Sequence, residues 1–239
     1  MAGFAAMLAA VLLFAAPAQA DGKRMLEADE AGEWLGVGRL NIAGTRFCTA
    51  TLIGERIALT AAHCLFHPRT GRAIRAEDIV FVAGTRLGVH AAARRVARTV
   101  VPRGYRHADA RTPEAMSADV ALVEFADPIS AEDVTAFEVG PEQPGERWSV
   151  VSYARDRAHA PSIEDDCRVV AAMGALRAID CEATFGASGS PVIARADGAR
   201  RVVGVISAIA RREDQPVSIV VMIAPHIDSL IADLRAPRP

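Results

Sequence analysis

The sequence predicts an all-β protein, either a barrel or a sandwich, in the chain that follows residue 20. Short apolar runs recur at regular spacing, and Gly, Pro, Asn and Asp residues typical of turns separate them. No helical pattern alternates with these runs, which argues against an α/β fold. Only residues 225–234 have the spacing of an amphipathic helix. Because half of the residues (51%) are hydrophobic, the chain can bury a sizeable core.

The first half follows a charged arm that extends to about Gly32 and carries little pattern. Its apolar runs are compact, and the last of them is almost entirely apolar after Asp119. The expected strands lie at 34–40, 46–53, 57–60, 78–84, 93–101 and 118–125.

The second half begins after a loop rich in Glu, Pro and Gly at 139–146, and we expect the boundary between the halves within 131–146. At the end of this half, Pro225 is suited to the first turn of a helix. One face of that helix would hold Ile227, Leu230, Ile231 and Leu234. The expected strands lie at 147–154, 167–173, 175–181, 190–195, 201–210 and 218–224.

The first twenty residues predict a signal peptide. The apolar run of residues 2–16 is shorter than the roughly 20 residues of a membrane span. An A-x-A pattern at Ala18 and Ala20 follows the run and predicts cleavage before Asp21. The alternative is an uncleaved anchor. A cleaved signal peptide implies a secreted or periplasmic protein with no membrane span left after cleavage.

The charge balance argues against a nucleic-acid partner. The net charge of −2 gives no basic excess for nucleic acid, and there is no acidic tail. Lys23 is the lone lysine, and the arginines are scattered along the chain. We therefore expect no nucleic-acid partner, and the sequence leaves the oligomeric state open.

The cysteines predict disulfides. The chain has four, an even number that suits an oxidising compartment and allows three connectivities. Pairing sequence neighbours would close two loops of about 15 residues, each worth about 3 kcal/mol. The sequence has no C-x-x-C spacing, so a metal site formed by cysteines has little support. The residues are Cys48, Cys64, Cys167 and Cys181.

Three motifs carry candidate chemistry. "LTAAHC" (59–64) places His63 after an expected strand, and "SADVALVEF" (117–125) places Asp119 at the head of another. A carboxylate at the lip of a buried strand needs hydrogen-bond donors, and an imidazole N–H is a natural one. "FGASGSP" (185–191) places Ser188 in a glycine-rich turn, where backbone amides can converge on an oxyanion. The chain order His, Asp, Ser matches the chymotrypsin triad rather than the α/β-hydrolase order, and Ser190 breaks G-x-S-x-G.

Alternatives exist for each residue. A serine in a glycine turn is usually structural, and only the two partner motifs favour a nucleophile. His67 could form a metal pair with His63, but the Glu of H-E-x-x-H is missing and Pro68 follows at once. Asp109 and Asp127 compete for the acid role, but both lie in turn-like, polar stretches.

Together "TAAHC", "DVALVEF" and "GASGSP" resemble the trypsin-like, chymotrypsin-fold serine protease family, over roughly Gly36 to Leu234. The Gly-x-Ser-Gly-Ser-Pro form is similar to the bacterial, glutamyl endopeptidase-like branch. The resemblance implies two six-stranded antiparallel β-barrels with the active site in the cleft between them, and a short C-terminal helix. The first barrel (21–130) would carry the base and the acid, and the second (131–239) the nucleophile.

The same resemblance implies a serine endopeptidase that needs no cofactor or metal and acts on protein or peptide substrates. It makes Ser188 the nucleophile, His63 the general base and acid, and Asp119 the orienting carboxylate. The backbone N–H groups of Gly186 and Ser188 would form the oxyanion hole. The alternatives are a non-catalytic binding or adhesion protein of the same fold, and an esterase.

Several positions depart from the family pattern. Ala187 stands where digestive enzymes carry the Asp that pairs with a freed amino terminus, so we expect no activation of that kind. "SAIA" (207–210) replaces Ser-Trp-Gly on the substrate strand, and no histidine on that strand supports a preference for acidic substrates. Glu182 stands six positions before Ser188, where trypsin has its pocket acid, but the local alignment is too loose to predict basic specificity.

Overall fold

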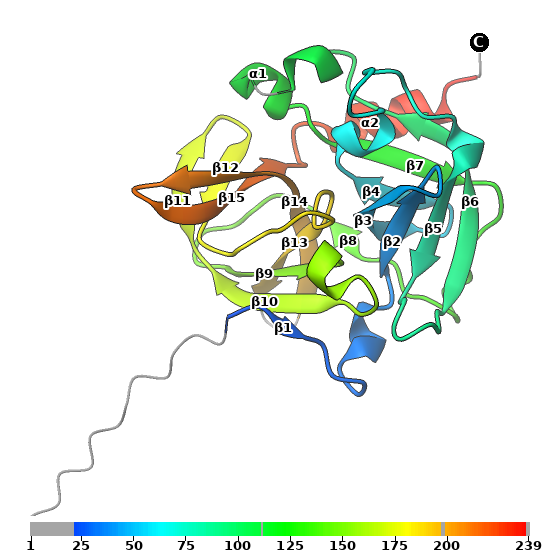
Figure 1. The fold of residues 1–239 in the computed structure, drawn as a ribbon, viewed down its shortest axis with the longest axis horizontal. Coiled ribbons are helices and arrows are strands. Elements are labelled where there is room, and N and C mark those ends of the chain that lie inside the picture. The colour runs from blue at the N-terminus through cyan, green and yellow to red at the C-terminus, as the bar shows by residue number, and fades with distance from the viewer. Residues whose placement is uncertain (1–21, 111, 197–198, 238–239) are drawn as a thin grey trace, which may run out of the picture.

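A computed structural model describes residues 22–110, 112–196 and 199–237, which form two β units that lie side by side (Figure 1). The mostly-β architecture with a short C-terminal helix confirms the predicted fold class. The predicted signal peptide, residues 1–20, lies outside the described residues. No helix in the described ranges has the length and apolar character needed to cross a membrane.

The first unit is a closed, six-stranded antiparallel barrel with the strand order β2-β3-β4-β7-β6-β5. Its strands coincide with the six apolar runs expected in the first half. Along β5, Ile79, Phe81 and Ala83 are buried and the residues between them are not, so alternate side chains fill the barrel. The bounds are β2 Val37–Ile42, β3 Arg46–Gly54, β4 Ile57–Thr60, β5 Ile79–Ala83, β6 Ala92–Val100 and β7 Ala121–Phe125.

The second unit is a nine-stranded sheet with the order β1-β10-β9-β13-β14-β15-β12-β11, and β8 pairs with β14 in parallel. It therefore has three strands more than the expected six-stranded barrel. The two-residue strands β1 and β8, from either side of the first barrel in the sequence, join it, as does β10, which the sequence does not predict. The bounds are β1 Arg24–Met25, β8 Glu138–Val139, β9 Arg147–Ser152, β10 Ser162–Cys167, β11 Val169–Met173, β12 Leu176–Ile179, β13 Pro191–Ala196, β14 Ala199–Arg212 and β15 Gln215–Met222.

The helices are short. α2 (Ile227–Arg235) begins just after the expected Pro225, buries Leu230 and Leu234, and packs on β6 and β7 of the first barrel. Arg98 on β6 donates to the carbonyls of Leu234 (2.7 Å) and Asp233 (2.9 Å), which lack partners within the helix. The others are α1 Pro113–Met116 and the 3₁₀ turns Ala31–Trp34, Ala62–Leu65, Ala76–Asp78, His107–Asp109 and Arg155–Arg157.

One hydrophobic core crosses from the first unit to the second. It joins Leu59 and Leu122 of the barrel to Val151, Tyr153 and other buried residues of the sheet. Burial of each such side chain stabilises the fold by about 1.5–3 kcal/mol. This shared core fixes the position of one unit against the other, and with it any site built from both.

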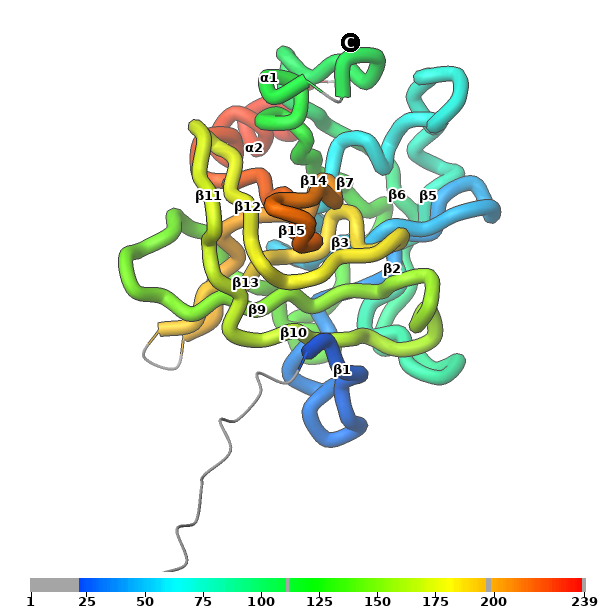
Figure 2. Tube along the Cα trace, turned by 60° about the vertical axis from the view of Figure 1, so that its left-hand side comes forward, coloured from blue at the N-terminus to red at the C-terminus, as the bar shows by residue number. Residues whose placement is uncertain are grey.

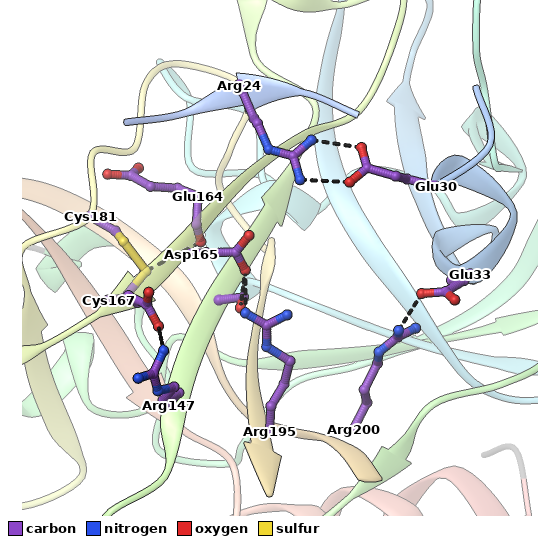
Figure 3. Close-up of polar contacts among 12 residues, drawn as sticks. Arg24, Glu30, Glu33, Arg147, Glu164, Asp165, Cys167, Cys181, Arg195 and Arg200 are labelled. Atoms are coloured by element: carbon purple, nitrogen blue, oxygen red, sulfur yellow. Dashed lines mark hydrogen bonds and ion pairs between the residues drawn. A yellow bond between two sulfur atoms is a disulfide. The ribbon is translucent and has the colours of Figure 1, made fainter. Parts of the chain in front are cut away.

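The charged arm before the first barrel belongs to the second sheet. β1 runs beside β10 in both views (Figure 1, Figure 2), and Leu26 is only 1% exposed. Figure 3 shows Arg24 facing Glu30, with N–O distances of 2.6 and 2.7 Å, and Arg200 paired with Glu33. The sequence predicts an arm without pattern, whereas these residues form a strand of the second sheet and two ion pairs that hold the arm in place.

Two disulfides join sequence neighbours. Cys48 on β3 pairs with Cys64 in the turn after β4, and Cys167 at the end of β10 pairs with Cys181 after β12. The described residues hold no free cysteine. The first disulfide fixes the turn that carries His63.

Candidate active site

His63 lies in the 3₁₀ turn Ala62–Leu65, three residues beyond the end of β4. Small residues at Ala61 and Ala62, both fully buried, let the chain turn closely under the barrel. The next residue, Cys64, is tied to β3 by its disulfide. The backbone of His63 is therefore fixed on both sides of the residue, and its side chain remains 25% exposed.

Asp119 binds His63 through both carboxylate oxygens. The imidazole Nδ1 lies 2.7 Å from Oδ2, and the backbone N–H of His63 donates to Oδ1 at 2.8 Å. Ser207, on β14 of the second unit, donates its hydroxyl to Oδ2 at 2.5 Å. Asp119 is 4% exposed, so a buried carboxylate receives three donors, one of them from the other unit.

These contacts determine the charge of Asp119. Burial alone raises its pKa, but the charge of His63 and the hydrogen bonds from His63 and Ser207 outweigh burial and hold the pKa below its usual value. The carboxylate is therefore ionised at neutral pH and accepts the proton on Nδ1. A neutral imidazole with Nδ1–H has a free lone pair on Nε2, as a general base requires.

Ser188 lies in the loop between β12 and β13, and this loop packs against the first barrel. The N–H of Thr49 on β3 donates to the carbonyl of Ser188 at 2.9 Å. Gly189, with φ of +78°, lies so close to Thr60 and Ala61 that a Cβ atom would collide with them. Since Ala61 is two residues before His63, the structure brings the serine loop beside the segment that carries the imidazole.

The Ser188 hydroxyl makes no hydrogen bond to any residue in the described ranges. The His63 Nε2 has the disulfide sulfur of Cys64 at 3.8 Å. The His63–Asp119 pair is thus formed, whereas the His63–Ser188 hydrogen bond is not. Catalytic hydrogen bonds are often long before substrate binds, so this geometry is compatible with a nucleophile and base.

In two peptide groups near Ser188, the carbonyl accepts a backbone hydrogen bond while the N–H has no acceptor among the described residues. The carbonyl of Phe185 accepts the N–H of Arg155 at 2.7 Å. Because a trans peptide directs its C=O and N–H oppositely, this bond directs the N–H of Gly186 away from Arg155. Gly186 has φ of +99°, and a Cβ there would lie 2.6 Å from the ring of Phe47. Only glycine suits this position.

The next such peptide joins Ala187 to Ser188. The carbonyl of Ala187 accepts the N–H of Ser190 at 2.9 Å, which orients the N–H of Ser188 in the opposite direction. Neither the Gly186 nor the Ser188 N–H donates to an acceptor within the described ranges. Both N–H groups are therefore free to bind an acceptor from outside the described residues.

Sequence reasoning missed several residues of this site. The sequence places Ser207 on the expected substrate strand, but its bond to Asp119 is not predicted; the signal is a single hydroxyl within the aliphatic run "VISAIA". Thr49 and Arg155 hold the serine loop from β3 and from the turn after β9, and no local pattern marks them.

The rejected alternatives lie elsewhere. The ring Nδ1 of His67 accepts the N–H groups of Arg69 (3.3 Å) and Thr70 (3.2 Å), as a loop histidine does. Asp109 and Asp127 are exposed. Cys48, His63 and Cys64 lie close enough to hold a metal ion, but their sulfurs are joined in a disulfide and offer no thiolate.

The carboxyl group of Glu164, which contacts the backbone just after β12, has a displaced pKa. Burial raises the pKa of Glu164 on β10 to about 7, even though its carboxylate accepts the N–H of Glu182 at 2.8 Å. The pKa of a glutamate is ordinarily about 4.3. Between these pH values the folded protein binds more protons than the unfolded chain, so its stability falls as pH rises.

Glu164→Gln is therefore expected to remove this fall in folding stability between about pH 4 and 7. Above pH 7 the variant should be more stable than the parent by about 1–2 kcal/mol, after allowing for the partial exposure of the group. Urea unfolding between pH 4 and 8 measures the effect, with exposed Glu132→Gln as the control. Equal pH slopes in the parent and Glu164→Gln would contradict the assignment.

Comparison with known proteins gives a family and a fold. The family model described as the trypsin-like peptidase domain matches residues 48–205, more than half of the chain. No curated protein matches the sequence. Among solved structures, a Glu endopeptidase in complex with MPD is similar, with a TM-score of 0.74 and 16% identity over 91% of this chain and 98% of that one. At this identity the likeness concerns the fold.

Proposed function

Because this chain belongs to the trypsin-like peptidase domain family, we propose that it is a serine endopeptidase with Ser188 as nucleophile, His63 as general base and Asp119 as orienting acid. The observation that carries the proposal is the buried Asp119 carboxylate, which accepts both N–H groups of His63 at 2.7 and 2.8 Å. A histidine held in this way has one tautomer and a fixed orientation.

In the first half of the reaction, the Ser188 Oγ attacks the carbonyl carbon of the peptide bond, and its proton passes to the His63 Nε2. Asp119 stabilises the resulting imidazolium. The former carbonyl oxygen becomes an oxyanion and binds the N–H groups of Gly186 and Ser188, which have no other acceptor among the described residues. The imidazolium then protonates the leaving amine, and an acyl ester on Ser188 remains.

In the second half, water attacks the acyl ester while His63 accepts a water proton. The same two N–H groups stabilise the second oxyanion. Collapse of the intermediate releases the new carboxyl end and returns the proton to Ser188. Water and a peptide are the only reactants, so the cycle balances without a metal or an organic cofactor.

The substrate class is protein or peptide. We expect no preference for acidic substrates, because β14 carries Ser207, Ala208 and Ile209 and no histidine. A secreted or periplasmic location, with the signal peptide cleaved before Asp21, agrees with two disulfides that need an oxidising compartment.

Covalent labelling by a fluorophosphonate tests the proposal. We expect the mature protein to be labelled on Ser188, with the site identified by peptide mass spectrometry, and Ser188→Ala to take no label. Ser190→Ala is the matched control, because this neighbouring hydroxyl is buried and has no hydrogen-bond partner in the described chain. It should be labelled as the parent is.

A folded parent protein that takes no label would overturn the proposal and favour a binding protein of the same fold. Amide and ester substrates of the same sequence separate a peptidase from an esterase. Hydrolysis of the ester alone would exclude the endopeptidase.

A further inference from the structure

The hydroxyl of Thr49 lies between the two units. Thr49 is on β3 of the first barrel, is fully buried, and directly follows the disulfide-bonded Cys48. Its side chain makes its hydrogen bonds to the second unit. We infer that the Thr49 hydroxyl is a positioning group for the loop that carries Ser188, an inference that rests on the proposed function.

The hydroxyl is satisfied as donor and as acceptor. It accepts the backbone N–H of Tyr153, just after β9, at 3.0 Å. Its own proton has two acceptors, the carbonyl of Gly186 at 3.1 Å and that of Tyr153 at 3.3 Å. The shorter contact leads to the loop with the open N–H groups, so one side chain joins the sheet to that loop.

The backbone of Thr49 holds the same loop at a second point. Its N–H donates to the carbonyl of Ser188 at 2.9 Å. The carbonyls of Gly186 and Ser188, on either side of buried Ala187, are therefore both bound to one residue. Holding these alternate carbonyls restricts rotation of the peptide groups from Gly186 to Gly189. The N–H of Ser188 lies within this restricted stretch.

Thr49 also reaches the segment of the general base. The Thr60 hydroxyl donates to the Thr49 carbonyl at 2.8 Å, and Thr60 is the last residue of β4 before the turn with His63. A single residue thus contacts the nucleophile loop, the second unit and the strand end leading to the imidazole. Such a contact can set the separation between Ser188 and His63, on which proton transfer depends.

The same strand provides a matched control. Thr51 lies two residues along β3, on the same side of the strand, and is equally buried. Its hydroxyl has no hydrogen-bond partner among the described residues. Thr49→Val and Thr51→Val therefore remove the same atom from the same strand, and only the first breaks a link to the loop.

The experiment compares these variants with Thr49→Ser, which keeps the hydroxyl. In Thr49→Val we expect kcat for a peptide substrate to fall about 10- to 100-fold, because small misplacements of reacting groups have effects of this order. KM should stay within about twofold, because contacts that hold the ground state are unchanged. The fluorophosphonate rate and the affinity for a peptidyl aldehyde, which forms an oxyanion, should fall with kcat.

Thr49→Ser should recover activity to within about threefold of the parent, and Thr51→Val to within about twofold. If Thr49→Val does not fold, Thr49→Ala replaces it, since the smaller side chain leaves room for water at the N–H of Tyr153. Unchanged labelling in the folded Thr49 variant would overturn the inference, as would equal losses in Thr49→Val and Thr51→Val. Absence of labelling in the parent would instead overturn the proposed function.

Discussion

Replacing His63 with alanine is expected to lower kcat for peptide hydrolysis by about 10⁶-fold. Without the imidazole, no group is placed to take the proton of Ser188 or to protonate the leaving amine. The Nδ1–Oδ2 contact of 2.7 Å is lost as well, so the buried Asp119 loses a partner. Steady-state kinetics on an amide substrate, with fluorophosphonate labelling of the same samples, measures the loss.

His67→Ala is the control for that variant. His67 is four residues from His63 but binds only the backbone of its own loop, at 3.2 and 3.3 Å. We expect kcat to stay within about twofold of the parent. If His67→Ala were as inactive as His63→Ala, the two histidines would act together and the triad assignment would be wrong.

Asp119→Asn is expected to lower kcat by about 10⁴-fold while the protein stays folded. The amide has nearly the same shape, but its NH₂ group would face an N–H of His63 or the hydroxyl of Ser207. The imidazole is then driven to the tautomer with its proton on Nε2, where it cannot accept the proton of Ser188. Kinetics measures the loss, and circular dichroism shows whether the fold is kept.

Asp127→Asn tests the competing acid that the sequence leaves open. This carboxylate is exposed in the turn after β7, and we expect the variant to keep the parent kcat. A loss of activity in Asp127→Asn together with a normal rate in Asp119→Asn would reverse the assignment. The site would then need a different orienting acid.

Much of the fold follows from local pattern. The six strands of the first barrel are short apolar runs bounded by turn residues, and each appears where the sequence predicts it. The helix at Ile227–Arg235 follows from its amphipathic spacing. Such patterns suffice because each strand buries one set of side chains in the nearest core.

β10 escapes this reasoning. Its sequence, Ser-Ile-Glu-Asp-Asp-Cys, carries three consecutive acids, and only tertiary partners make it a strand. The hydroxyl of Ser149 donates to Asp165 at 2.6 Å, and so does Arg195. These donors lie far away in the sequence, so no local window contains the reason for the strand.

The site divides in the same way. His63, Asp119 and Ser188 belong to motifs whose residue types predict their candidate roles from the sequence alone. Ser207 and Thr49 are ordinary hydroxyl residues whose roles depend on contacts between the two units, as in the 2.5 Å bond from Ser207 to Asp119. One sequence without its fold does not reveal such contacts.

The placement of β1 and α2 has a consequence for how the protein comes apart. β1 precedes the first barrel but pairs with β10 of the second sheet, while α2 follows the second sheet but packs on β6 and β7 of the first barrel. Each unit thus packs one of its terminal segments against the other unit. Because neither unit can move away without breaking contacts in its neighbour, we expect separation of the two units to be coupled to global unfolding.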